Sequence, residues 1–313
     1  MEQLLFAVLN GVIYGLLLFM VSAGLTLIFG MMGVLNFAHA SFYMLGAYFA
    51  YSLQAWVGFW PAIVISPLLV GAIGIGVERW FLRRVHKHGH AHELLLTFGL
   101  FFIFSELVKL VYGNYPVDYR IPDFLRFAAF ELGGLDYPFY RLFIGGVAVA
   151  MFVAIWLLLT RTRVGIIVRA AIYRPSMVEA LGHNVPLVFM GVFGIGAALA
   201  AVAGAVAGAF YTTNPNMALE LGVIVFVVVV VGGLGSLEGA MLASLLIGLT
   251  TSLAVAVDAS LADALDLVGL GDAAREFGGL LDADLRGLAA TLPYFLMLLV
   301  LLLRPGGLMG EGD

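Results

Sequence analysis

The sequence is dominated by long apolar runs, separated by short stretches that hold most of the charged residues. From Gln3 to Val77 the chain has no Asp, Glu, Lys or Arg, a run of 75 residues. As one helix at ~1.5 Å per residue, this run would be about 110 Å long, whereas the hydrocarbon core of a bilayer is about 30 Å thick. The run therefore has to cross a membrane more than once. The pattern predicts an all-α, polytopic membrane protein.

Nine charge-poor runs are candidate spans, so we expect about 8–9 transmembrane or re-entrant helices. We interpret residues 1–313 as a single transmembrane domain. Residues 30–33 and 56–61 are the expected turns inside the first long run, because they hold glycine and proline. The predicted spans cover residues 4–30, 34–55, 60–77, 94–112, 142–160, 187–210, 221–232, 237–257 and 289–304.

The composition agrees with this class. Only 11% of the residues are charged, 63% are hydrophobic and the mean hydropathy is +1.07. Soluble domains have about 25% charged and about 45–50% apolar residues, so a water-soluble enzyme is excluded. The chain has no cysteine, which excludes disulfides, thiolate metal sites and cysteine nucleophiles. Because residues 1–3 hold no basic side chain and the apolar run after them is long, we expect this run to be a retained span.

The positions of Lys and Arg predict the orientation. Segment 78–93 holds four basic and two acidic residues, and segment 161–186 holds four basic residues and one acidic residue. Segment 258–288, in contrast, holds seven acidic and two basic residues. Because cytoplasmic loops are enriched in Lys and Arg, we expect 78–93 and 161–186 in the cytoplasm and 258–288 outside. The number of spans between these loops agrees, and it places the N-terminus outside and the C-terminus inside.

Two apolar segments are interrupted by glycine. The run 221–232 is short for a full crossing, and residues 232–236 separate it from the next run. A shift of 200 residues lays Gly33 on Gly233 and Asn36 on Ser236, which suggests two pseudo-repeated halves. Paired broken segments point to a transport site, where unwound backbone lines a cavity. The predicted pathway residues are Gly33, Asn36, His39, Gly233, Gly235 and Ser236.

Asn36 and His39 are spaced so that they share one face of a helix. An amide and an imidazole within an apolar run cost free energy unless they find partners inside the bundle. One interpretation is a position in the transport pathway. The others are hydrogen bonds between helices, or a solvated turn near the membrane surface. The sequence leaves these interpretations open.

Segment 161–186 carries the signals of a short helix. Ser176 and Glu179 have the spacing of a capping box, Pro175 precedes them, and Gly182 is a typical C-terminal stop. The pattern predicts one short helix on the cytoplasmic face, preceded by four arginines. A docking helix for a cytoplasmic partner and an ordinary surface loop both fit this pattern.

Three further features need an assignment. A small residue at every fourth position of the run 187–210 predicts close packing between helices, without a chemical role. Glu238 either faces a cavity or caps the helix that follows it. Four alternating histidines in segment 86–92 could bind a metal ion, but a solvated loop is the favoured interpretation, so we predict no metal site. The predicted packing residues are Gly196, Ala200, Gly204 and Gly208.

Motifs for an energy source are absent from the sequence. It contains no G-x-x-x-x-G-K-[ST] motif for ATP phosphates, no ladder of buried acids for proton coupling and no arginine-rich span for voltage sensing. A solute pathway in such a chain is a passive channel, an ion-coupled carrier or a permease driven by separate ATPases.

Several stretches resemble the LivH-type permease subunit of branched-chain amino-acid ABC importers. They include residues 24–30 and 33–48, with Asn-Phe-Ala-His at 36–39 as the most specific part. The resemblance continues through 161–171 and 179–182 to the glycine-rich segment 232–240. Departures are Ala40 where the family usually has glycine, Glu238 where proline is common, and the acidic segment 258–288.

The resemblance implies a non-enzymatic subunit of a bacterial inner membrane that carries branched-chain or other hydrophobic amino acids. It implies four kinds of partner: a second, similar permease, two cytoplasmic ATPases, a periplasmic binding protein and membrane lipid. No cofactor and no nucleic-acid partner are expected. An ion-coupled carrier, an ABC importer for urea or amides, and a structural subunit without a pathway are the alternatives. The residues implied in coupling to the ATPases are Arg169, Ser176, Glu179, Ala180 and Gly182.

Overall fold

The structure is a computed structural model that describes residues 2–132, 134–257 and 284–310, together with Asp263, Asp266, Gly269 and Glu276. The predicted acidic loop, 258–288, falls largely outside the described residues. In the described part of the chain, helices predominate and the strands form one small hairpin. The prediction of an all-α, polytopic membrane protein is therefore confirmed.

Six helical segments are long and apolar enough to cross a membrane, counted over the described residues. They are α1 (Glu2–Met32), α3 with its continuation (Phe59–His88), α5 (His90–Tyr112), α6 (Phe139–Arg161), α9 (Val185–Ala207) and α11 (Leu237–Ala256). The continuation of α3 contains a π-helical turn, Glu78–Leu82, and the short α4 (Arg83–Val85). The other helices are α2 (His39–Val57), α7 (Arg163–Tyr173), α8 (Pro175–Ala180), α10 (Met217–Gly232), α14 (Leu285–Leu288) and α15 (Leu292–Leu303).

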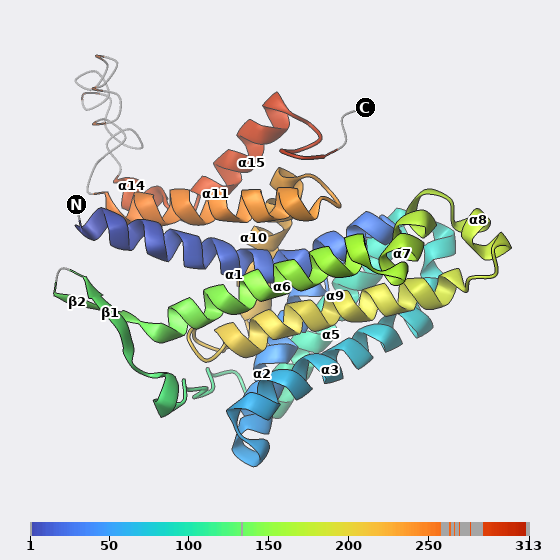
Figure 1. Ribbon diagram of the computed structural model, residues 1–313, viewed down its shortest axis with the longest axis horizontal. Coiled ribbons are helices and arrows are strands. Elements are labelled where there is room, and N and C mark those ends of the chain that lie inside the picture. The colour runs from blue at the N-terminus through green and yellow to red at the C-terminus, as the bar shows by residue number, and fades with distance from the viewer. Residues whose placement is uncertain are drawn as a thin grey trace.

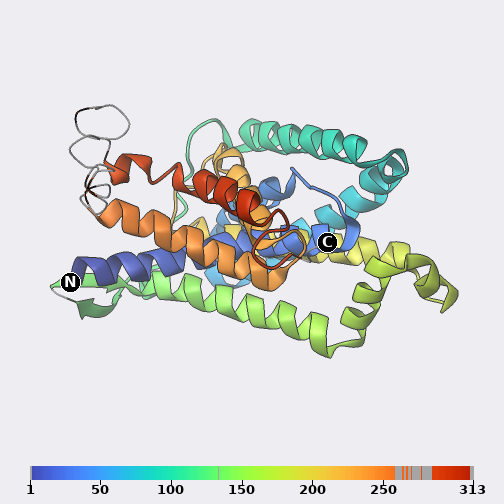
Figure 2. The same cartoon turned by 90° about the horizontal axis from the view of Figure 1, so that it is seen from above.

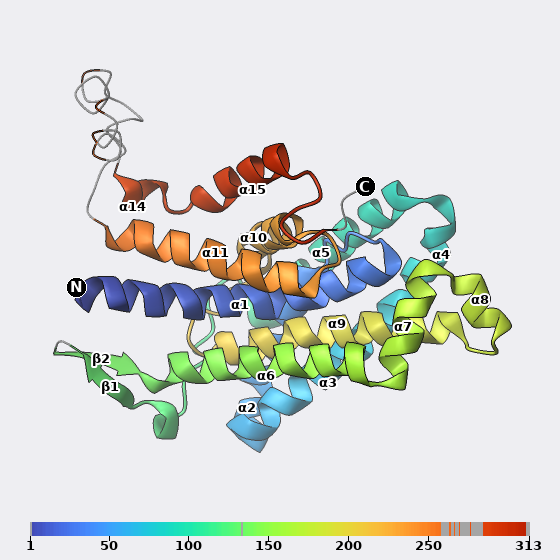
Figure 3. The same cartoon turned by 45° about the horizontal axis from the view of Figure 1, so that its top comes forward.

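The two ends of the bundle differ (Figures 1 and 3). Strands β1 (Ala128–Leu132) and β2 (Leu135–Pro138) pair antiparallel at the end that also holds the N-terminus, called here the hairpin end. Helix α8 projects at the opposite end, called here the α8 end. The sequence did not predict the hairpin, which lies in the segment between two predicted spans.

Glycines bring the long helices into backbone contact. Helix α11 runs antiparallel to α1 and lies beside it in the views of Figures 1 and 2. A Cβ atom on Gly15 would lie 2.7 Å from the carbonyl oxygen of Ser244, and one on Gly248 would lie 2.4 Å from that of Gly11. Such close approach gives dense van der Waals contact, which is a main source of helix association in a bilayer.

Helix α2 begins inside the bundle and not at its end. The predicted span 34–55 is therefore wrong in its first residues, because residues 34–38 are not helical and α2 starts at His39. The Nε2 atom of His39 lies 2.9 Å from the carbonyl oxygen of Val21. Val21 precedes the end of α1 at Met32 by three turns, about 16 Å. After α1 the chain thus turns back into the bundle before α2 begins.

Helix α10 also begins at this depth. A Cβ atom on Gly222, in its second turn, would lie 3.1 Å from the Cβ atom of Ala40, at the start of α2. After α10 ends at Gly232, the chain reaches Gly235, which packs against Gly30 near the end of α1. Segments 33–40 and 233–240, which the sequence aligns, therefore lie at different depths: the first re-enters the bundle, whereas the second turns at the α8 end.

The C-terminal segment completes α10. The amide nitrogens of Leu308 and Met309 donate to the carbonyl oxygens of Val231 and Gly232, at 2.8 and 3.0 Å. The last carbonyl groups of a helix have no partner within the helix, so this contact satisfies two of them. Gly233, with φ of +102°, lies so close to Gly310 that a Cβ atom would be 2.4 Å from its nitrogen.

Candidate functional site

A cavity of about 270 Å³ lies where α2 and α10 begin, and it is called here the central cavity. Its wall is almost entirely apolar, with side chains from α1, the turn before α2, α2, α5 and α10. The exceptions are Asn36 and His39, two of the predicted pathway residues, which are 3% and 1% exposed. The other lining residues are Leu25, Leu35, Phe37, Ala40, Phe98, Phe101, Ala218, Leu219, Gly222, Val223, Val225 and Phe226.

Asn36 shapes the entry into α2. Its Oδ1 atom accepts a hydrogen bond from the Ala38 amide at 3.1 Å, and its carbonyl oxygen accepts one from the His39 amide at 3.1 Å. These two bonds make the tight turn that starts the helix after the extended residues. The Nδ2 atom of Asn36 is buried and has no hydrogen-bond partner. Asn36, which lines the cavity, therefore keeps one unpaired donor.

His39 fixes the depth of this turn. A carbonyl oxygen only accepts hydrogen bonds, so Nε2 carries a proton and donates to Val21. The Nδ1 atom is buried without a partner. In the neutral ring Nδ1 is an acceptor, so two residues that line an apolar cavity carry one unpaired donor and one unpaired acceptor, both buried. An unpaired buried polar atom costs about 1–3 kcal/mol, which favours a role in contacting a solute.

The sequence did not identify the apolar side of this site. Phe98 of α5 and Phe226 of α10 both pack against Phe37, with ring centroids 6.2 Å away. Gly222 is the small residue that leaves room beside Ala40. A signal was present, since Gly222 is the only glycine between Met217 and Val231. Its partner, however, comes from a helix that begins 178 residues earlier in the chain, at His39.

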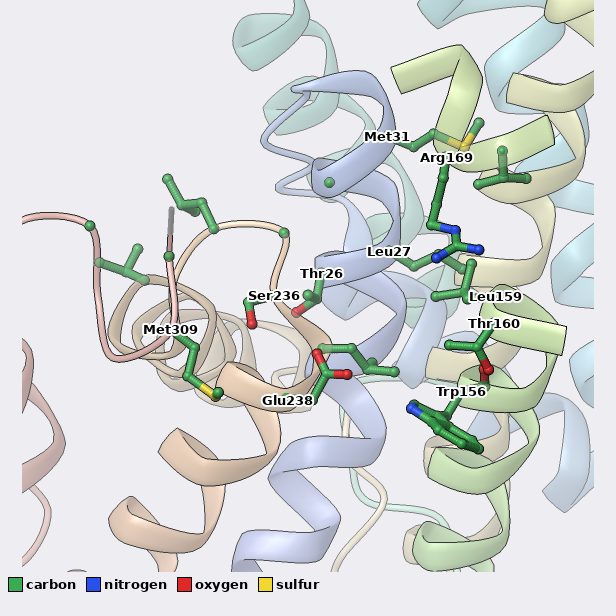
Figure 4. Close-up of a pocket in the computed structure, with 18 of the residues that line it drawn as sticks. Thr26, Leu27, Met31, Trp156, Leu159, Thr160, Arg169, Ser236, Glu238 and Met309 are labelled. Carbon is green, nitrogen blue, oxygen red and sulfur yellow. The ribbon is translucent and has the colours of Figure 1, made fainter. Parts of the chain in front are cut away.

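The remaining predicted pathway residues lie elsewhere. Gly33 ends α1, with φ of +66°, and Gly233 packs against the C-terminal segment. Gly235 and Ser236 line a second cavity, of about 680 Å³, which is called here the side cavity. It lies at the α8 end between α1, α6, α7 and the turn that joins α10 to α11 (Figure 4). The six predicted pathway residues are therefore not brought together: two line the central cavity, two line the side cavity, and Gly33 and Gly233 line neither.

The predicted coupling segment forms two helices, α7 and α8, that project from the bundle (Figure 1). Ala171, Val178 and Val185 form a small apolar cluster that holds α7, α8 and the start of α9 together. Of the predicted coupling residues, Arg169 lies on α7 and lines the side cavity. Ser176, Glu179 and Ala180 lie on α8 and are exposed, and Gly182 ends the turn after it with φ of +88°.

The predicted capping box at Ser176 is wrong. Helix α8 begins at Pro175, its N-cap residue is Arg174, and no side chain caps it. Proline fits the first turn of a helix because it has a fixed φ and no amide hydrogen to satisfy. The helix therefore already includes Pro175 and Ser176, whereas a capping Ser176 would precede its first residue. The predicted stop at Gly182 is confirmed, since its amide donates to the Glu179 carbonyl oxygen at 2.9 Å.

The small residues of α9 lie against α1 and α2. A Cβ atom on Gly196 would be 2.8 Å from the Gly24 carbonyl oxygen, and one on Gly204 would be 1.9 Å from the Tyr43 carbonyl oxygen. A Cβ atom on Gly208, directly after α9, would be 2.9 Å from the Cβ atom of Ala47, and Ala200 is fully buried. These contacts position the first turns of α2, and with them Asn36 and His39.

The histidine segment is organised by a carboxylate that the sequence analysis left without a role. Glu93, 2% exposed, accepts hydrogen bonds from Nδ1 of His86 and, at 3.2 Å, Nδ1 of His90. Nearby, Arg83 forms an ion pair with the buried Glu78 at 2.8 Å. Within the described part of the chain, no group of three or more His, Asp or Glu side chains is placed to hold a metal ion.

Comparisons with known proteins show to which family this chain belongs. The model of the family described as "Branched-chain amino acid transport system / permease component" matches residues 7–302. The permease protein BraD of Pseudomonas aeruginosa is 27% identical, over 97% of this chain and 95% of that protein. The permease protein LivH of Escherichia coli K12 is 30% identical, over 79% of this chain and 84% of that protein. LivH of Methanocaldococcus jannaschii is 26% identical, over 78% and 79%. The chain therefore belongs to the family of branched-chain amino acid transport system permease components.

Proposed function

We propose that this permease carries branched-chain or similar hydrophobic amino acids across the inner membrane, as one subunit of an ABC importer. The solute passes the central cavity, and separate ATPases supply the energy. The chain itself performs no covalent chemistry. The observation that carries the proposal is the pair of unpaired polar groups, on Asn36 and His39, in an otherwise apolar cavity between two helices that begin inside the bundle.

The chemistry of the central cavity suits a zwitterion with an apolar side chain. The wall holds no charged residue, so it attracts neither a cation nor an anion strongly. The Nδ2 donor of Asn36 matches a carboxylate oxygen, and Nδ1 of His39 matches an ammonium group. Phe37, Phe98 and Phe226 supply apolar contact for the side chain. Weak, few contacts also allow the solute to leave, which a transport site requires.

The orientation follows from the charged loops. Segments 78–93 and 161–186, the two basic segments, both lie at the α8 end in Figure 1, so we place this end in the cytoplasm. The hairpin end and the N-terminus then face the periplasm, and the C-terminus lies in the cytoplasm. A periplasmic binding protein would deliver the solute at the hairpin end.

The α7–α8 arm is the proposed contact with an ATPase. Met177 and Leu181 are 56% and 79% exposed, and the charged Arg174 and Glu179 stand beside them. An exposed apolar pair with charges around it is typical of a docking surface. Arg169, at the root of the arm, links its movement to the bundle. Rocking of this arm would switch the pathway between an opening to the periplasm and an opening to the cytoplasm.

A second, similar permease is the proposed cover of the central cavity. Phe98, Leu219 and Val223 line this cavity and are also 47–59% exposed. The cavity therefore opens on an apolar face of the chain. Because a solute in this opening would otherwise meet lipid, a second permease subunit packed on this face would enclose the pathway between the two chains.

The proposal is tested by the substitution Asn36→Ala in the assembled transporter. We expect ATP-driven uptake of leucine into vesicles to fall at least tenfold, because the only unpaired donor of the cavity is removed, a loss of ~1.4 kcal/mol or more. The matched control is Ser105→Ala: Ser105 is buried in α5, but its hydroxyl donates to the Phe101 carbonyl oxygen and does not line the cavity. This control should transport normally.

Equal uptake by the Asn36→Ala and Ser105→Ala variants would contradict the proposed pathway. The same vesicles separate the alternatives for the whole chain. An ion-coupled carrier would take up leucine under a sodium or proton gradient without ATP, and an importer for urea or amides would prefer acetamide or urea to leucine. We expect neither result.

A further inference from the structure

The side cavity holds two opposite charges that do not neutralise each other. Arg169 reaches it from α7 and Glu238 from the first turn of α11, and Figure 4 shows the two side chains on different walls. Both residues are exposed. Across the part of the chain that the structure describes, no ion pair or hydrogen bond engages the side chain of either one. The cavity therefore presents a free cation and a free anion at separate positions.

Two hydroxyl groups add to this polar pattern. Thr26 of α1 lines the cavity, is 1% exposed, and its Oγ1 atom has no hydrogen-bond partner. The Ser236 hydroxyl caps α11 by accepting from the Gly239 amide at 3.1 Å, so its own proton remains free to donate. Figure 4 shows both side chains between α1 and α11, beside Glu238. A buried hydroxyl without a partner costs free energy, which a ligand here would recover.

A third hydroxyl group of the wall, on Thr160, already donates to the Trp156 carbonyl oxygen at 2.6 Å. The other side chains of the wall are apolar. Leu27 and Met31 come from α1, Trp156 and Leu159 from α6, and Leu301 from α15. A volume of about 680 Å³ lies within the range of sites for small molecules, about 300–1,000 Å³. One cation, one anion, two hydroxyls and an apolar wall are together the requirements of a free amino acid with an apolar side chain.

We propose that the side cavity is a binding site for such an amino acid in its zwitterionic form, distinct from the central cavity. Arg169 binds the carboxylate, because guanidinium groups pair with carboxylates through two parallel hydrogen bonds. Glu238 binds the ammonium group, and Thr26 and Ser236 hydrogen-bond the same polar end. The apolar side chain lies against Leu27 and Trp156.

The site would connect the α7–α8 arm to the body of the permease. Arg169 belongs to the arm, whereas Glu238 and Ser236 belong to the turn between α10 and α11. A bound amino acid would tie these elements together and restrain the arm. This consequence rests on the proposed function, in which the α8 end faces the cytoplasm and the arm contacts an ATPase. An amino acid that accumulates in the cytoplasm would then slow its own import.

The experiment measures equilibrium binding of radiolabelled L-leucine to the full chain in lipid nanodiscs, without ATP and without a binding protein. We expect Arg169→Gln and Glu238→Gln each to weaken binding at least tenfold. The matched controls are Arg163→Gln, an exposed arginine of α7 outside the cavity, and Glu131→Gln, an exposed glutamate of the hairpin. Both controls should bind leucine like the unaltered chain.

Two competitors assign the charges. The anion 4-methylpentanoate has the carboxylate but no ammonium group, and the cation 3-methylbutylamine has the ammonium group but no carboxylate. We expect Arg169→Gln to weaken only the anion as a competitor, and Glu238→Gln to weaken only the cation. A merely structural role of either residue would weaken both competitors alike.

The proposal is overturned if leucine binds the two cavity variants as tightly as the controls, or if only Asn36→Ala lowers its binding. Because binding is measured without transport, this outcome is independent of the proposed function. If the transporter takes up leucine but Arg169→Gln and Glu238→Gln bind leucine like the unaltered chain, the permease function stands and the second site is excluded. If both substitutions weaken leucine binding but the assembled transporter takes up no leucine, the second site stands and the proposed function is excluded.

Discussion

Reversing the charge of Glu179 is expected to abolish ATP-driven uptake while the chain still folds. Glu179 is exposed on α8, and its side chain makes no hydrogen bond or ion pair within the described residues, so Glu179→Arg leaves the bundle intact. On a docked ATPase, however, the new cation would meet groups selected to face an anion, and like charges in an interface cost several kcal/mol. We expect the ATPase subunits to be lost on co-purification and uptake to fall to background.

A matched control keeps this result specific. Lys87 is exposed in the other basic segment at the α8 end, and Lys87→Glu makes a charge reversal of the same size there. This variant should retain the ATPases and transport normally. If Glu179→Arg transported at the rate of Lys87→Glu, the α7–α8 arm would not be the coupling element.

Gly204→Ala is expected to destabilise the fold strongly, although it adds only one methyl group. The Cβ atom of alanine would lie 1.9 Å from the carbonyl oxygen of Tyr43 in α2, and backbone on both sides prevents a simple side-chain adjustment. Helices α2 and α9 would have to separate. Overpacking of this kind costs about 1–3 kcal/mol and occasionally more, and we expect ~3 kcal/mol, measured by unfolding in mixed micelles.

The same substitution at Gly99 is the control. Gly99 lies in α5, where a Cβ atom would meet nothing within 4 Å. Gly99→Ala should therefore leave the protein as stable, or more stable by up to about 1 kcal/mol, because alanine favours helix. Since Tyr43 lies one turn after His39, Gly204→Ala should also lower uptake. Equal stability of the two variants would show that α2 and α9 are not packed through glycine.

The spans could be predicted from the sequence because each depends on its own residues. A helix that crosses a bilayer holds few charged residues, so charge-poor runs located α1, α5, α6, α9 and α11 closely. The breaks at Gly33 and Gly232 were predictable because glycines interrupt the apolar runs there. The path of the chain after each break could not be predicted in this way. The depth at which α2 begins depends on a hydrogen bond from His39 to Val21, which lies in another helix.

The candidate site was predictable only in its polar half. Asn36 and His39 were identified because polar side chains are rare in an apolar run, whereas Phe98 and Phe226 look like any other apolar residue. The side cavity joins Arg169 to Ser236, residues that the sequence assigned to different roles, because α7 folds back beside the α10–α11 turn. Such contacts depend on tertiary packing, which no local pattern encodes.

The central claim is that this chain moves amino acids but does not supply the energy. The most direct test reconstitutes the chain into sealed vesicles, first by itself and then with its co-purified permease, ATPase and binding-protein partners, and measures leucine accumulation against a gradient. We predict uphill accumulation only in the complete assembly and only with ATP. Uphill accumulation of leucine by the isolated chain, driven by an ion gradient, would contradict the account.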